Sequence, residues 1–177
     1  RSSLAQVLRP ALSQFAEVLT AGRTGCDVTL DLEWPVEQIR LPEGSETVIN
    51  LASHFGGKDF AGMMGAEQLN VLSTLKLCSA CTRSGVGHLV LLSSIFAGLG
   101  ENSPFYGSYA LSKRHAEEVA RLYCTGFNLP LTILRPAQIY GVGESFSKHQ
   151  PFLYAIIDRE ESNEEIVFFG ANDAKRN

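Results

Sequence analysis

The sequence predicts an α/β fold in which helices cover both faces of a parallel sheet. Helical and strand-like segments alternate along the chain, and the strand-like segments are continuous apolar runs without alternate polar positions. Continuous runs are typical of strands buried on both faces, and right-handed βαβ crossovers connect parallel strands. The 177 residues, of which 45% are hydrophobic, suffice for one domain with a core, or for one domain and part of a second.

The chain opens with an expected helix and an expected strand. Apolar side chains recur at helical spacing over residues 4–19, with Pro10 as a weak interruption. Residues 22–25 are glycine-rich and predict a turn. Residues 26–32 then form a β-rich run that ends before Trp34-Pro35, because a residue before proline is restricted to extended conformations.

The middle of the chain continues the alternation of strands and helices. Residues 47–52 are a short β-rich apolar run, typical of a buried parallel strand. Residues 65–84 have helical periodicity, and Ser84-Gly85 is a stop signal. Residues 88–94 predict the next buried strand.

The last part of the chain repeats the pattern. A loop rich in Gly, Pro and Asn leads into an expected helix over residues 108–125, which Gly126-Phe127-Asn128 ends. Residues 131–136 predict another strand. Beyond it, we expect a helix near 149–159 and a strand near 166–169.

Charge and hydropathy argue against two classes of partner. There are 15 Lys and Arg residues against 19 Asp and Glu, and the net charge of −4 comes without any basic stripe of the kind that coats nucleic acid. No apolar run is long enough to span a membrane. The first residues also lack the apolar core of a signal peptide, so we expect a cytoplasmic protein.

The cysteines and histidines predict no metal site. The chain has four cysteines, and the pair Cys78-x-x-Cys81 falls within an expected helix. We expect small buried residues with reduced thiols there. No second cysteine pair and no histidine pair at zinc-like spacing accompanies them, and the four histidines are scattered.

The pattern with the most chemical meaning is Tyr109-Ala110-Leu111-Ser112-Lys113. On a helix, Tyr109 and Lys113 lie on one face, so the ammonium can approach the phenol and lower its pKa. A phenol tuned in this way can exchange a proton with a substrate hydroxyl or carbonyl. Ser94, at the end of a buried strand, could orient the same oxygen. The Tyr-x-x-x-Lys spacing alone more often marks a solvent-exposed pair. The order of strand, loop, helix and strand around it is what favours a catalytic role.

Five stretches together make the chain resemble the extended short-chain dehydrogenases/reductases, in the NAD(P)-dependent epimerase/dehydratase group. These stretches are residues 48–52, residues 70–74, residues 91–94, Tyr109 to Lys113 with His115 to Glu118, and residues 134–141. The resemblance covers about residues 27–177 in the family's order.

The resemblance implies roles for individual residues. Tyr109 is implied as the catalytic acid/base, Lys113 as its tuning residue and ribose ligand, and Ser94, rather than Ser93, as the hydrogen-bond partner of the substrate oxygen. The implied cofactor-binding residues are Asp31 and Leu32 at the adenine, Leu51, Ala52 and Ser53 in a lining turn, Asn70, Tyr109, Lys113, and Pro136 beside the nicotinamide carboxamide. From the residues themselves, Asp31 could instead cap a turn, Asn70 could be a buried hydrogen-bonding residue, and Pro136 could end a strand.

One departure from the family pattern concerns the phosphate-binding loop. The family's Gly-x-x-Gly-x-x-Gly loop is absent, because neither residues 22–25 nor residues 56–62 have the required strand–loop–helix context. The resemblance therefore implies a Rossmann-like doubly wound sheet that lacks the N-terminal βαβ unit. We expect a partial NAD(P)-binding domain over residues 1–145 and the start of a small substrate-binding domain over residues 146–177. We also expect this polypeptide by itself to bind NAD(P) poorly and to be inactive.

The function implied by the resemblance is that of an epimerase, dehydratase or reductase acting on a nucleotide sugar, with NAD or NADP as cofactor. Arg1-Ser2-Ser3 resembles the segment after the family's second strand, where an arginine often faces the 2′-phosphate of NADP, although a solvated terminus accounts for these residues as well. Two alternatives stay open: a reductase of a non-sugar carbonyl, and a non-catalytic Rossmann-like dinucleotide-binding protein. A homodimer is compatible with the resemblance, although no pattern in the sequence itself indicates one.

Overall fold

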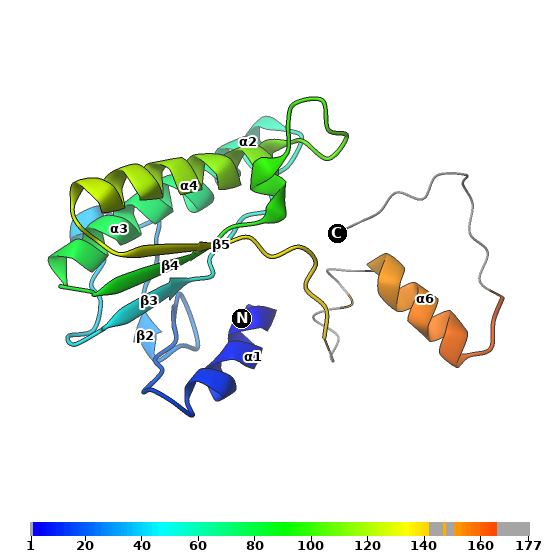
Figure 1. Cartoon of the computed structure of the whole chain (residues 1–177), viewed down its shortest axis with the longest axis horizontal. Coiled ribbons are helices and arrows are strands. Elements are labelled where there is room, and N and C mark those ends of the chain that lie inside the picture. The colour runs from blue at the N-terminus through cyan, green and yellow to red at the C-terminus, as the bar shows by residue number, and fades with distance from the viewer. Residues whose placement is uncertain (1, 142–146, 148–150, 166–177) are drawn as a thin grey trace. The chain divides into compact units, whose positions relative to one another are not determined.

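The computed structural model describes residues 2–141, 147 and 151–165. The chain divides into two compact units, Arg1–Pro136 and Ala137–Asn177 (Figure 1). The expected strand at 166–169 lies outside the described residues, as does much of the expected domain at 146–177. Across the described ranges, no helix is both long and apolar enough to cross a membrane.

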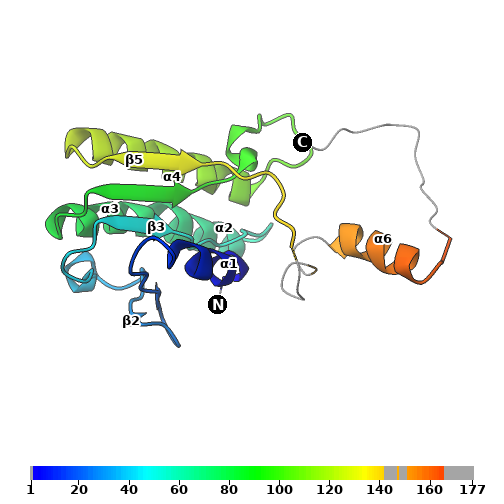
Figure 2. The ribbon, with the colours of Figure 1, turned by 60° about the horizontal axis from the view of Figure 1, so that its bottom comes forward.

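The first unit is built on a sheet of three parallel strands. They are β3 (Thr47–Asn50), β4 (His88–Leu92) and β5 (Leu131–Leu134), in the order β3-β4-β5. A second, two-stranded parallel sheet joins β1 (Ala21–Gly22) to β2 (Val28–Thr29). Because β3, β4 and β5 run in the same direction, their carboxyl ends share one edge of the sheet (Figures 1 and 2). The predicted α/β class with a parallel sheet is confirmed.

A continuous helical stretch connects β3 to β4. It consists of α2 (Phe60–Ala66), a π-helical segment called η2 (Glu67–Leu72), and α3 (Ser73–Arg83). It starts before the predicted residue 65 because the Asp59 carboxylate caps it, accepting a hydrogen bond from Gly62 N at 2.9 Å. The predicted stop is confirmed: Gly85 has a φ of +67°, and Val86 N donates to Cys81 O at 2.9 Å.

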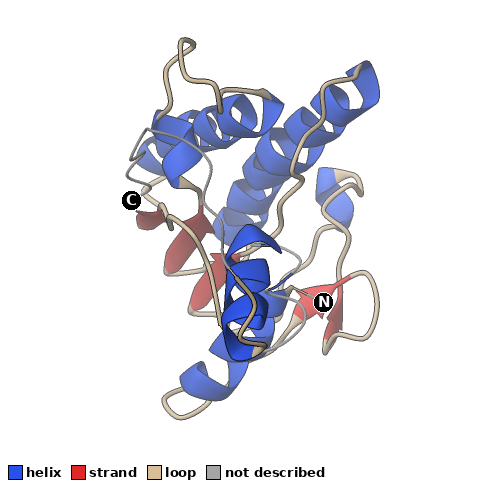
Figure 3. Cartoon of the chain, turned by 90° about the vertical axis from the view of Figure 1, so that its right-hand side faces the viewer, coloured by secondary structure: helices blue, strands red, loops and turns tan. Residues whose placement is uncertain are grey.

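The second crossover, from β4 to β5, carries a short 3₁₀ turn and the longest helix. The turn is η3 (Ile95–Gly98), and the helix is α4 (Ser108–Gly126), within one residue of the prediction. Asn128, with a φ of 56°, ends α4, and Leu129 N donates to Cys124 O at 2.9 Å. Figure 3, which views the main sheet nearly end-on, shows helices stacked above the layer of strands.

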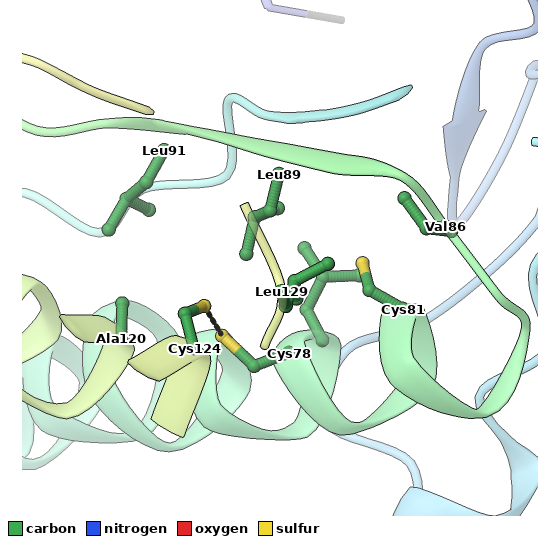
Figure 4. Close-up of a cluster of buried hydrophobic side chains, with 9 residues drawn as sticks. Cys78, Cys81, Val86, Leu89, Leu91, Ala120, Cys124 and Leu129 are labelled. Carbon is green, nitrogen blue, oxygen red and sulfur yellow. Dashed lines mark hydrogen bonds between the residues drawn. The ribbon is translucent and has the colours of Figure 1, made fainter. Parts of the chain in front are cut away.

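The core lies between the main sheet and the pair α3 and α4 (Figure 4). Its buried members are Leu77, Cys78, Cys81, Val86, Leu89, Leu91, Ala120, Cys124 and Leu129. All four cysteines are free thiols, as predicted, and burial raises the pKa of Cys81 to about 12, so this thiol is unreactive. The opposite face of the sheet is more open, since Ile49 is 38% exposed and Leu134 is 47% exposed.

The N-terminal elements are shorter than the sequence predicts. Helix α1 (Ser3–Leu12) ends well before residue 19. Pro10 lacks the N–H that an interior turn needs, and Asp27 draws the following chain into an extended shape by accepting hydrogen bonds from Thr20 N and Oγ1 at 2.8 and 2.7 Å. Phe15, counted as part of the apolar face, is 86% exposed. The predicted strand at 26–32 pairs only through β2, because β1 offers just two residues as a partner.

The second unit contains α6 (Pro151–Glu161), which corresponds to the helix predicted near 149–159. Tyr154 ties this helix to the chain that enters the unit. Its hydroxyl accepts a hydrogen bond from Gly141 N at 3.0 Å and donates to Gly141 O at 2.5 Å.

Candidate active site

Tyr109 and Lys113 lie on successive turns of α4, as the spacing predicts. The Lys113 Nζ is 5.8 Å from the centroid of the Tyr109 ring, and it donates a hydrogen bond to Leu92 O at 2.9 Å. Lys113 is only 4% exposed. Burial lowers the pKa of Lys113 to about 8, and the negative charge of Glu117 opposes part of this effect. The site therefore holds a desolvated cation close to a phenol.

Aromatic side chains enclose the Tyr109 ring. Phe55, from the loop after β3, stacks on it with the ring centroids 5.5 Å apart. Phe96, from η3, meets it edge to face with the centroids 6.2 Å apart. These contacts fix the plane of the phenol and join α4 to the two loops that leave the carboxyl ends of β3 and β4.

Ser93 and Ser94, which follow β4, have different partners. The buried Ser94 Oγ accepts a hydrogen bond from Phe96 N at 3.2 Å, so its own proton stays available to another acceptor. The Ser93 Oγ instead donates to Glu117 Oε1 at 2.5 Å. The backbone is extended at Ser94, so successive side chains point to opposite sides, and only the Ser94 hydroxyl is free to act as a donor.

Asn70 connects the loop after β3 to α4. Its Oδ1 accepts from His54 N at 2.8 Å, and its Nδ2 donates to His54 O at 2.8 Å and to Ser112 Oγ at 2.9 Å. Asn70 lies in the π-helical segment, where the wider turn brings this buried amide against the loop. The sequence left open whether Asn70 is a buried hydrogen-bonding residue, and the structure shows that it is one.

The loop that Asn70 holds includes the predicted turn Leu51, Ala52 and Ser53, which is half-buried. Farther along the loop, Ser108 at the start of α4 exchanges two hydrogen bonds with the Gly57 backbone, at 2.8 and 3.0 Å. Gly56 has a φ of +76°, and a Cβ there would meet Ser108 Oγ at 2.3 Å, so only glycine fits. Ser53 Oγ is buried and has no hydrogen-bond partner among the described residues.

The structure places the remaining predicted site residues apart from this group or at its border. Pro136 follows β5, and its carbonyl accepts a hydrogen bond from Ile95 N at 3.1 Å, which brings it beside the Ser94 segment. Asp31 and Leu32 follow β2, which belongs to the other sheet. The Asp31 carboxylate accepts from Glu33 N at 3.0 Å, so it does cap a turn. Leu32 packs against the hydrophobic core.

Glu117 is a site residue to which the sequence analysis assigned no role. It is fully buried on the same face of α4 as Lys113, and its carboxylate also binds Arg135 in a fork, with Nε at 2.7 Å and Nη2 at 2.6 Å. Burial by itself would raise the pKa of Glu117, but hydrogen bonds from Arg135, Ser93 and Arg121 lower it to about 2. The sequence contains a signal for such a residue: Glu117 is charged, yet it shares the buried side of the helix with Ala116 and Ala120.

Two curated relatives of known activity are similar to this chain in sequence, and both are larger proteins. One is the CDP-abequose synthase of Salmonella typhimurium, 24% identical over 75% of this chain and 44% of its own length. The other is the dTDP-4-dehydro-6-deoxy-D-allose reductase of Streptomyces bikiniensis, 27% identical over 74% of this chain and 45% of its own. The chain thus spans about half the length of these relatives.

A family model and a solved structure extend the comparison over almost the whole chain. Residues 9–177 match the model of the NAD dependent epimerase/dehydratase family. MoeE5, solved in complex with UDP-glucose and NAD, superposes with a TM-score of 0.66 over 94% of this chain and 60% of its own, at 20% identity. That likeness shows that the two proteins share a fold.

Proposed function

The chain belongs to the NAD dependent epimerase/dehydratase family, and on that premise we propose that the protein uses NAD to epimerise, dehydrate or reduce a nucleotide sugar. The observation that carries the proposal is the pairing of Tyr109 with a buried Lys113 on α4, beside Ser94 with its free hydroxyl proton. Intact acid/base chemistry of this kind argues against a non-catalytic dinucleotide-binding protein, which is the alternative from another class.

The proposed roles follow from the hydrogen-bonding capacity of each group. Tyr109 takes the proton from a sugar hydroxyl, or returns it to a carbonyl, at its phenolic oxygen. Lys113, whose ammonium lies 5.8 Å from the centroid of the Tyr109 ring, balances the negative charge that develops on the phenolic oxygen during proton transfer. Ser94 donates its hydroxyl proton to the same substrate oxygen and holds it near Tyr109.

The substrate class is proposed from the relatives. Two relatives carry CDP and dTDP in the names of their products or substrates, and the similar fold was solved with UDP-glucose. The nucleotide base differs among them, whereas a sugar attached to a nucleoside diphosphate is common to all. We therefore assign the protein to nucleotide sugars as a class, in preference to non-sugar carbonyl compounds.

The residues at the carboxyl ends of the strands have hydrogen-bonding groups that could pair with the ribose and the amide of a dinucleotide. The Lys113 ammonium has three N–H groups, and one of them donates to Leu92 O within the described part of the chain. The buried Ser53 Oγ needs a partner that the described residues do not supply. Lys113 and the Leu51–Ser53 turn would hold the cofactor together with Pro136, and Asp31 and Leu32 are proposed for its adenine end. When bound, NAD supplies the hydride chemistry.

The test is turnover by Tyr109→Phe in the native protein, supplied with NAD and a panel of CDP-, dTDP- and UDP-sugars. We expect kcat to fall by about 10²–10⁴-fold, the range typical for loss of a general acid/base. Tyr123→Phe is the matched control, because Tyr123 lies on the same helix and stacks on Phe127, away from the site. Wild-type turnover by Tyr109→Phe contradicts the proposed role of the tyrosine. Saturable binding of a nucleotide sugar without turnover supports the non-catalytic alternative.

Several further features belong to the same proposal. We propose that residues 1–145 contribute to the cofactor-binding domain and residues 146–177 to a substrate-binding domain. We also predict that the protein is cytoplasmic and forms a homodimer. Gel filtration of the native protein with light scattering tests the dimer.

A further inference from the structure

The buried carboxylate of Glu117 joins three elements that carry the proposed catalytic and cofactor-binding residues. Its Oε1 accepts hydrogen bonds from Ser93 Oγ and Arg135 Nε, and its Oε2 accepts from Arg135 Nη2 and Arg121 Nη2. Ser93 directly precedes Ser94, and Arg135 directly precedes Pro136. A single side chain of α4 thus binds the residue before each of two proposed site residues, at the carboxyl ends of β4 and β5.

The Leu92–Ser94 segment is fastened to α4 on two successive turns. Lys113 Nζ donates to Leu92 O at 2.9 Å, and Ser93 Oγ donates to Glu117 Oε1 at 2.5 Å. These two bonds align the strand end with the helix that carries Tyr109. The β5 end is held in the same way, because Arg135 bonds Glu117 and Ile95 N donates to Pro136 O at 3.1 Å.

Glu117 also balances the charges around Lys113. Lys113 and Glu117 are adjacent on the inner face of α4, while the partly exposed Arg121 on α4 and Arg135 after β5 complete the charged groups bonded to this carboxylate. Without that negative charge, no other charged group among the described residues would offset the cost of burying the Lys113 ammonium. Removing that charge therefore favours loss of the Lys113 proton.

We propose that Glu117 is a positioning residue for the reaction: its buried carboxylate holds the strand ends that carry Ser94 and Pro136 against the helix that carries Tyr109 and Lys113, and its negative charge lies one helical turn from the Lys113 ammonium. The inference rests on the function proposed above. Glu117 touches neither substrate nor cofactor, and it acts through Ser93, Arg135 and Lys113.

The test compares Glu117→Gln with Glu118→Gln in the native protein. Gln keeps the size of the side chain and one acceptor oxygen for Ser93, and the half-exposed arginines can be hydrated, so the variant is expected to fold. Because a misplacement of about 1 Å can cost about 10²-fold, we expect kcat to fall by about 10- to 100-fold while KM for the sugar changes little. The alkaline limb of the pH–rate profile should move to lower pH. Glu118 is exposed on the same helix, and its variant should match the wild type.

A second variant separates the geometric role from the electrostatic one. Ser93→Ala removes one hydrogen bond to Glu117 and keeps its charge, so kcat should fall several-fold with the alkaline limb unmoved. The amide of Ile95 should also exchange its hydrogen faster than in the wild type. If Glu117→Gln fails to fold, unchanged kcat and unchanged Ile95 exchange in Ser93→Ala overturn the proposal.

A readout independent of turnover distinguishes failure of this inference from failure of the proposed function. A wild-type protein that turns over no nucleotide sugar refutes the proposed function. The titration of Lys113, followed by NMR of its ¹³Cε resonance, still decides the present inference. We expect a lower midpoint in Glu117→Gln than in the wild type and in Glu118→Gln. An unchanged midpoint together with an unchanged kcat or Ile95 exchange rate overturns it.

Discussion

Lys113 is the residue at which chemistry and stability conflict. Its ammonium is almost fully buried, and a single backbone carbonyl among the described residues accepts a hydrogen bond from it. Burying a charge is costly, which is why the pKa of Lys113 lies at about 8 rather than near its usual value of 10.5. A fold under selection for stability alone would place an apolar side chain here, which is consistent with the role proposed for this cation beside Tyr109.

We therefore predict that Lys113→Met raises the free energy of unfolding at pH 7, by about 2 kcal/mol, while abolishing activity. The wild-type protein should itself become more stable from pH of about 8 to about 10.5, because in this window the unfolded chain binds a proton that the folded chain has lost. Urea denaturation across this pH range measures both effects. Lys58→Met, at an exposed position, is the control. A Lys113→Met variant less stable than the wild type contradicts the prediction.

At the scale of elements, the helical stretch from Phe60 to Arg83 does more than cover the sheet. Its π-helical segment turns Asn70 toward the loop after β3, where the side-chain amide accepts a hydrogen bond from His54 N and donates one to His54 O. A regular α-helix would carry a different residue to that point. The loop that would line the cofactor is thus held by a helix on one side and by Ser108 at the start of α4 on the other.

We predict that Asn70→Ala destabilises the protein by about 2–3 kcal/mol, because it leaves the half-buried N–H and C=O of His54 without the partner that Asn70 provides. Gln68→Ala, at an exposed position in the same segment, should change stability by no more than about 0.5 kcal/mol. Chemical denaturation gives the stability, and hydrogen exchange at the His54 amide reports the loop. Slow exchange at His54 in Asn70→Ala would show that the loop is held by other contacts.

At the scale of the whole molecule, the glycine-rich stretch after β3 does not provide a phosphate cradle. A Cβ on Gly62 would meet Gly57 Cα at 2.5 Å, so this loop is folded tightly on itself. The Asp59 carboxylate already caps the helix N-terminus that follows, and its negative charge would repel a pyrophosphate.

We therefore predict that a polypeptide of these 177 residues binds NAD with a dissociation constant weaker than micromolar. The reason is that the pyrophosphate finds no glycine-rich strand–loop–helix unit in this sequence. Isothermal titration calorimetry with NAD measures the affinity directly. A micromolar dissociation constant would show that the groups around Lys113 and Ser53 suffice for binding.

Residue types with strong local preferences, such as glycine and asparagine at helix ends, predict the parts of the fold that depend on neighbouring residues in the chain. The C-terminal ends of α3 and α4 follow from glycine and asparagine at left-handed positions, and the sequence predicts both ends to within about a residue. The N-terminal helix and the strand at 26–32 were overestimated. Periodicity records apolar spacing, but the length of a strand depends on its partner, and β1 supplies only two residues.

The sequence by itself determined the alternation of strands and helices, and the helical spacing that sets Lys113 beside Tyr109. Both depend on interactions between residues close in the chain. The tertiary structure decided which serine keeps a free hydroxyl proton, because that choice depends on Glu117 receiving the Ser93 hydroxyl from a distant helix. It also decided that Asn70 bridges a loop to α4 and that Glu117 joins the ends of β4 and β5. A buried polar group must find a partner wherever packing brings one, and that partner cannot be inferred from spacing along the chain.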